Sequence, residues 1–76
     1  MARTPQQPRR RLAVEVRRAE ILVAAATEFG ARPYSEVAVA DVAERAGASE
    51  ALIYHYFNDK AGLYTELLQQ EVTELL

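Results

Sequence analysis

Cysteine is absent from this sequence of 76 residues. The chain therefore cannot form a disulfide scaffold, a zinc finger with thiolate ligands or a cysteine nucleophile, and its composition fits a reducing cytosol. Apolar stretches such as 22–26 and 37–40 are far shorter than the ~18 residues of a membrane-spanning helix. The basic N-terminus is not followed by the apolar segment of a secretory signal. These absences predict a soluble, cytoplasmic protein with no membrane partner.

The small size of the chain excludes further classes of function. Fourteen residues are alanine, and an alanine-rich sequence favours helices. A domain of ~60–80 residues has a core too small to enclose a metabolite, which excludes most enzymes. The single histidine, His55, provides no metal cluster, and Ser49 would lie across a short helix from it, so the two form no catalytic pair. We expect no enzymatic activity, no cofactor and no metal.

Charge is distributed unevenly although the net charge is only −2. Residues 1–18 contain six arginines and one glutamate, whereas residues 19–76 contain three basic and ten acidic residues. Such asymmetry is typical of a chain that meets a polyanion with one end, and also of a solubilising tail. Residues 1–11 lack apolar periodicity and are predicted to be a disordered basic arm.

Apolar residues recur at helical spacing from residue 12 onward, and no segment alternates as a strand would. A first helix is predicted to end at a C-cap, Gly30, with Pro33 in the connector that follows it. Its apolar face would consist of Val14, Arg18, Ile21, Leu22, Ala25 and Phe29.

Three shorter helical patterns follow this connector. The second helix spans about 39–46 and ends at Gly47, and the third spans 50–57 behind an N-cap, Ser49. The fourth begins near residue 60, after capping residues 58–59, and Gly62 near its start is unfavourable for a helix. Its apolar face would consist of Leu63, Tyr64, Leu67, Leu68, Val72 and Leu75. The fold class is therefore all-α, with one domain over residues 12–76.

The second and third helices, joined by 47–49, have the spacing of a helix-turn-helix over about 39–58. In that motif the second helix enters the major groove of DNA, which is ~12 Å wide. The tight turn needs a residue that tolerates positive φ, and Gly47 supplies it. An ordinary helical hairpin has the same feature, so the spacing alone leaves both interpretations open.

The third helix carries an unusual outward surface. At ~100° per residue, Ile53 and Phe57 point to the core, and the remaining positions are expected to face outward. A merely solvated face would carry glutamate and lysine, whereas tyrosine, histidine and lysine side chains can donate to phosphates and small apolar groups can contact thymine. The alternative is that a tyrosine is a half-buried core residue. The expected outward set is Ala51, Leu52, Tyr54, His55 and Tyr56, with Lys60 one turn further on.

Three segments together resemble a known family. They are Ile21-Leu22-x-Ala24-Ala25-x-x-x-Phe29-Gly30, Val42-Ala43-x-x-Ala46-Gly47-Ala48-Ser49 and Ile53-Tyr54-His55-Tyr56-Phe57-x-x-Lys60-x-x-Leu63. Over residues 18–68 the chain resembles the DNA-binding domain of the TetR family of bacterial regulators. The resemblance implies a homeodomain-like, three-helix head plus the start of a fourth helix. That helix would lead into a ligand-binding and dimerisation domain that is absent from this chain.

The resemblance also implies a function. It implies a transcriptional regulator, and more specifically a repressor, that binds a palindromic operator in double-stranded DNA as a homodimer and responds to a small-molecule inducer. Helix 50–57 would lie in the major groove. The positions of Tyr54, His55, Tyr56 and Lys60 would contact bases or phosphates, and those of Glu50, Ala51 and Leu52 would reach base edges or the DNA backbone.

Three positions depart from the family pattern. Ala38 replaces the usual serine or threonine at the start of the second helix, Ala40 replaces a common basic residue, and Leu52 replaces a serine or threonine. None of the three side chains can donate to a phosphate, so the second helix lacks the phosphate anchor that the resemblance implies. The basic arm, Arg9, Arg10 and Arg11, is expected to compensate in an adjacent minor groove. For Glu50, stabilisation by the helix dipole is favoured over contact with a cytosine amino group.

A protein-interaction module is the rival interpretation. The predicted fourth helix ends in Leu75-Leu76, with nothing after it to cover its apolar face, and exposed apolar patches usually mark a partner surface. Binding to double-stranded DNA at low salt would distinguish the two interpretations.

Overall fold

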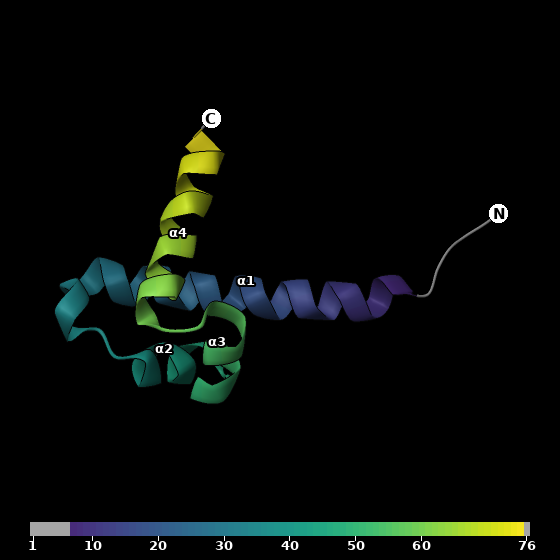
Figure 1. The fold of residues 1–76 in the computed structure, drawn as a ribbon, viewed down its shortest axis with the longest axis horizontal. Helices are drawn as coiled ribbons and strands as arrows, with labels where there is room; N and C mark the ends of the chain where they lie inside the picture. Colours follow the sequence, from purple (N-terminus) through teal and green to yellow (C-terminus); the bar gives the residue numbers. More distant parts are fainter. Residues whose placement is uncertain (1–6, 76) are drawn as a thin grey trace.

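The computed structural model describes residues 7–75, with side chains for residues 13–70. It contains α1 (Gln7–Ala31), a short 3₁₀ helix η1 (Tyr34–Glu36), α2 (Val39–Ala46), α3 (Glu50–Phe57) and α4 (Lys60–Leu75). Figure 1 shows α1 running across the molecule, with α2 and α3 on one side of it and α4 rising from the other. The predicted all-α class is confirmed, and no strand occurs within the described part of the chain.

The boundaries of α1 differ from the prediction at both ends. Residues 7–11 were expected to be disordered, but α1 begins at Gln7. Pro8 is tolerated in a first turn because its missing N–H would have no partner there, and the arginines that follow are good helix formers. At the other end Gly30 lies inside the helix and is no C-cap, because α1 continues to Ala31 before Pro33 prevents its extension. The remainder of the predicted arm, residues 1–6, lies outside the described residues.

The hydrophobic core lies where α1, α2, α3 and the first turns of α4 meet. Each helix contributes residues at the spacing that its apolar face predicts, and Val37 of the connector joins them. Val14 was expected on the core face of α1 but is 44% exposed, because the first turns of α1 extend past the other helices. Leu68, also expected on a core face, is 44% exposed. The buried set is Ile21, Leu22, Ala24, Ala25, Val37, Val39, Val42, Ala43, Ile53, Phe57, Leu63 and Leu67.

A nearly buried carboxylate ties α1 to α2. Glu28, only 7% exposed, accepts hydrogen bonds from Arg32 one turn later and from Nε of Arg45 on α2 at 2.7 Å. Arg32 also reaches Asp41 at the start of α2, at 3.4 Å. The hydrogen bond from Arg45 is the main cause that lowers the pKa of Glu28, and burial opposes it. The cluster therefore contributes most to folding while Glu28 is ionised.

The elbow between α3 and α4 is a tight γ-turn. Asn58 has φ 73° and ψ −54°, and the N–H of Asp59 donates to the carbonyl of Phe57 at 2.9 Å. Asp59 then caps α4, since its Oδ1 accepts from the N–H of Gly62 at 2.7 Å. A Cβ added to Gly62 would overlap the carbonyl oxygen of Phe57. The glycine that seemed unfavourable in the sequence is therefore required for this close approach.

Within residues 7–75, none of the helices combines the length and the apolar character needed to cross a membrane.

Candidate nucleic-acid interface

The turn between α2 and α3 forms through a left-handed glycine and a serine cap. Gly47 has φ 70° and ψ 33°, and the N–H of Ala48 donates to the carbonyl of Ala43 at 2.9 Å, as in a Schellman motif. Ser49 precedes α3, and its Oγ accepts from the N–H of Leu52 at 3.1 Å. The two helices are thereby held in the helix-turn-helix arrangement that the spacing predicts.

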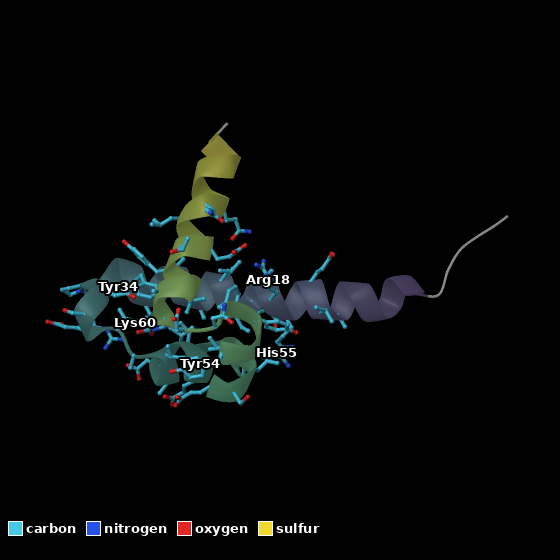
Figure 2. The ribbon with its side chains drawn as sticks, viewed as in Figure 1. Arg18, Tyr34, Tyr54, His55 and Lys60 are labelled. Carbon is cyan, nitrogen blue, oxygen red and sulfur yellow. The ribbon has the colours of Figure 1, made fainter. Side chains whose placement is uncertain are left out.

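Two buried anchors fix which side of α3 faces outward. Ile53 and Phe57, one turn apart, are both buried in the core. The opposite flank consequently faces solvent: Tyr54 is 43% exposed, and Ala51 and His55 are exposed as well. Figure 2 shows Tyr54 and His55 on α3, away from α4. The structure therefore brings Ala51, Tyr54 and His55 together on one surface, which we call the α3 face.

Leu52 and Tyr56 do not belong to this surface in full. Both are half-buried and pack against the edge of the core, whereas Leu52 was expected to lie well away from it. They are four residues apart and so share one flank of α3 beside the buried anchors. Packing of their long side chains over the core edge explains the difference. The outer part of each side chain remains accessible on that flank.

Lys60 makes its contacts with the connector between α1 and α2. Its Nζ donates to the backbone carbonyls of Tyr34 and Val37, each at 2.8 Å, and lies 4.5 Å from the centroid of the Tyr34 ring. An ammonium group has three N–H donors, and these two bonds occupy two of them. The expected phosphate donor is therefore held against the connector between α1 and α2.

The other predicted positions are more scattered. Ala40 is exposed near the start of α2, which begins behind Ala38 without a side-chain cap. Glu50 is exposed in the first turn of α3, where the helix dipole favours a carboxylate. The predicted arm residues Arg9, Arg10 and Arg11 lie on the helical backbone of α1, but their side chains are outside the described set.

The helices of the motif supply little positive charge. The sequence of α3 contains no lysine or arginine, and α2 contains only Arg45, which is bonded to Glu28. Arg17 of α1 donates to the carbonyl of Gly47 at 3.4 Å, and the same guanidinium group lies 3.6 Å from a carboxylate oxygen of Glu20. Among the described side chains, the cation that contacts the turn before α3 therefore comes from α1.

Comparison with protein families gives a match that includes the helix-turn-helix. The sequence model described as "Bacterial regulatory proteins, tetR family" matches residues 21–67, more than half of the chain. The chain belongs to the TetR family. The matched segment runs from the core residues of α1 to the buried Leu67 of α4 and contains the whole helix-turn-helix. Membership supports DNA binding and transcription regulation as the class of function.

A characterised relative agrees with this membership. The chain is 36% identical over 66 residues to the HTH-type transcriptional activator FasR of Mycolicibacterium smegmatis (strain ATCC 700084 / mc(2)155). The match covers 87% of this chain and 30% of the relative, so the TetR-family chain spans less than a third of that protein. Comparison with solved structures gives no significant match.

Two arginines of this TetR-family chain have roles that sequence reasoning missed. Arg17 reaches the turn at Gly47, as described above. Arg18 pairs with Glu66 of α4 at 2.6 Å, and its guanidinium lies 5.0 Å from the centroid of the Phe57 ring. The position of Arg18 on the predicted face of the first helix indicated its direction, but the partners of both arginines are distant in sequence and no local pattern marks them.

Proposed function

We propose that this chain is the sequence-specific DNA-binding head of a transcriptional regulator and that α3 enters the major groove of double-stranded DNA. The observation that carries the proposal is the α3 face, an exposed surface of Ala51, Tyr54 and His55 backed by the buried anchors Ile53 and Phe57. A single α-helix with its side chains fits a major groove ~12 Å wide. The proposal includes no enzymatic role.

The chemistry of the α3 face suits a duplex. Ala51 is small enough for close approach, and its methyl group can contact the methyl group of thymine. The Tyr54 hydroxyl and the His55 ring can donate to base edges or phosphates. On the half-buried flank, the Tyr56 hydroxyl is proposed to position the protein on a phosphate, and Leu52 to contact a base edge.

Affinity is proposed to come largely from the basic segment of α1. Each phosphate that a cation neutralises adds affinity that depends on salt and not on base sequence. Because α3 contains no cation, Arg9, Arg10 and Arg11 are the main charges available to meet the DNA. Their proposed site is a minor groove beside the one that α3 occupies. Ala40, at the start of α2, would then lie close to the DNA backbone without donating to it.

The remaining parts of the proposal follow the family. One short helix contacts few base pairs, so a homodimer on a palindromic operator is proposed, with dimerisation outside this chain. Response to a small-molecule inducer and a place in the cytoplasm are proposed on the same basis. Repression was expected, but the relative described above is named an activator. The proposal therefore covers DNA binding and regulation of transcription, and it assigns neither repression nor activation.

The test is binding of the 76-residue chain to duplexes selected by it from a random pool, measured over a range of salt concentrations. His55→Ala should change the preferred base at one position, with ~1–3 kcal/mol of discrimination lost there. Thr65→Ala, an exposed change on α4, is the matched control and should leave the selected sequence unchanged. Equal loss on all duplexes would show that His55 only positions the protein, and no binding in dilute buffer would refute the proposal.

The rival function, a helical protein-interaction module, is favoured by one observation. Leu68 on α4 is 44% exposed, on the expected apolar face of that helix. Val72 and Leu75, which would extend this face, lie outside the described side chains. Absence of DNA binding at low salt together with loss of self-association in Leu68→Ser would support this alternative.

A further inference from the structure

Lys60 occupies a site made by the protein itself. The two carbonyls that accept from its Nζ, those of Tyr34 and Val37, belong to η1 and to the residue that follows it. Hydrogen bonds from an ammonium group are charge-assisted and stronger than neutral ones. The ring of Tyr34 adds a cation–π contact on the same ammonium. Figure 2 shows Tyr34 and Lys60 next to each other at the base of α4.

The ring of Tyr34 packs against aromatic rings from two helices, and 38% of the residue is exposed. Its ring stacks on Phe29 of α1, with centroids 5.6 Å apart, and meets the edge of Tyr64 of α4 at 5.0 Å. The Tyr34 carbonyl also accepts from the N–H of Val37 at 3.2 Å. Lys60 is therefore anchored to a cluster that joins α1, the connector and α4.

The hydrogen bond from Lys60 to the Val37 carbonyl links the two segments that flank the helix-turn-helix. Val37 lies two residues before α2 begins, and Lys60 lies three residues after α3 ends at Phe57. The bond between them holds the segment that enters the motif against the segment that leaves it. Between Phe57 and Lys60 the chain passes through the γ-turn at Asn58, whose positive φ needs support from the surrounding structure.

We propose that Lys60 is a positioning residue that sets the orientation of α3 and that it is not a phosphate ligand. This inference rests on the proposed binding of α3 to DNA. Two carbonyls and an aromatic ring hold the ammonium group against the connector, so its one remaining donor could meet a phosphate only from that position. A positioning residue affects how well α3 fits its own sequence, whereas a phosphate ligand affects all duplexes equally and contributes to the salt dependence.

The test compares Lys60→Met with the unchanged chain on a selected duplex and on an unrelated one, well below the melting temperature. We expect affinity for the selected duplex to fall about tenfold more than affinity for the unrelated duplex. The slope of log K against log salt should stay unchanged. Arg10→Gln is the charge control, because a lost phosphate contact reduces the magnitude of that slope by ~0.9.

Two results for Lys60→Met would overturn the inference. A slope reduced as in Arg10→Gln, with equal loss on both duplexes, would make Lys60 a phosphate ligand. A lower melting temperature with the preference for the selected duplex intact would make its role purely structural. Failure of the unchanged chain to bind any duplex would instead refute the proposed function.

Tyr34→Leu provides a second variant that leaves every charge in place. It removes the ring beneath the ammonium, and the preference for the selected duplex should fall several-fold with an unchanged slope. If Lys60→Met does not fold, this variant decides the question. A reduced preference supports the positioning role, and an unchanged preference overturns it.

Discussion

The turn that enters α3 and the elbow that leaves it both redirect the chain within a few residues, but they do so with different means. At the entry, Gly47 adopts the left-handed conformation that glycine tolerates, and Ser49 caps the next helix. At the exit, a non-glycine residue, Asn58, adopts positive φ. The only glycine of the elbow, Gly62, serves instead to admit a backbone carbonyl. The entry is therefore encoded locally, whereas the exit depends on contacts with the rest of the fold.

The largest loss of stability is expected from a substitution in the elbow that leaves α3. In Gly62→Ala the new Cβ would overlap the carbonyl oxygen of Phe57, which cannot move without opening the γ-turn. We expect a loss of about 3 kcal/mol or more in the free energy of unfolding, the upper range of overpacking costs. Urea denaturation followed by circular dichroism measures it.

Gly30→Ala is the matched control for that substitution. Gly30 is helical, and among the described residues no atom lies within 4 Å of a Cβ built there. This change should therefore raise stability by ~0.5–1 kcal/mol, because alanine is favoured over glycine inside a helix. A similar loss in both variants would show that the elbow is not the tight joint described.

The next largest loss of stability is expected from a change in the Glu28 cluster, which supports the turn that enters α3. Arg45, which bonds Glu28, lies two residues before Gly47. Glu28→Gln leaves the guanidinium group of Arg45 without its carboxylate and that of Arg32 with Asp41 alone, and at neutral pH it should cost more stability than removal of a single cap.

The effect of Glu28→Gln should also depend on pH with a defined sign. The pKa of Glu28 is lowered in the folded state, so its stabilisation is complete above the unfolded value of ~4.3 and is lost as pH falls through the folded value. Unfolding of both proteins between neutral pH and pH ~3 should show the difference shrinking with acid. A constant difference would contradict the assigned role of the ionised carboxylate.

Gly47→Ala is expected to have a moderate effect. Alanine at φ 70° costs roughly 1–2 kcal/mol, and no atom in the described chain obstructs its Cβ. Since the penalty is only conformational, Gly47→Asn should recover part of the stability, because asparagine tolerates this region better. Equal losses in the two variants would point to a steric role for Gly47.

The smallest effect sharpens the comparison of the two caps. Ser49→Ala and Asp59→Ala each remove one side-chain acceptor for a helix N–H, and each should cost ~1 kcal/mol. At the exit, Asp59 also follows the strained residue Asn58. We therefore expect the loss in Asp59→Ala to be the greater of the two. Thermal denaturation of both variants under identical conditions tests this order.

The contrast between the two junctions also explains what the sequence could predict. The start of α3 and the buried positions of Ile53 and Phe57 follow from residue preferences and helical periodicity, and these act over a few residues. The partners of Lys60 lie 23 and 26 residues earlier in the chain. No local pattern marks such a bond, so the sequence predicted neither of these two partners.

Packing explains the other differences. Leu52 was expected to face solvent from its angle on the helix alone, but its length lets it cover the core edge. Glu28 has the charge of a surface residue and yet occupies the inward side of α1, because Arg45 of another helix neutralises it there. The first turns of α1 were expected to be disordered for lack of apolar residues, although their helix-forming arginines suffice to continue the helix.

The unbroken course of α1 has a consequence for the basic segment. Its 25 residues correspond to a rod of about 37 Å, and only the second half of that rod is embedded in the core. Because the helix is continuous, the direction in which its first turns point is fixed relative to the rest of the domain. Inserting two residues near position 15 would rotate the first turns of α1 by ~200° about the helix axis. Inserting seven would return these turns to within ~20° of their original direction and move them outward by two helical turns.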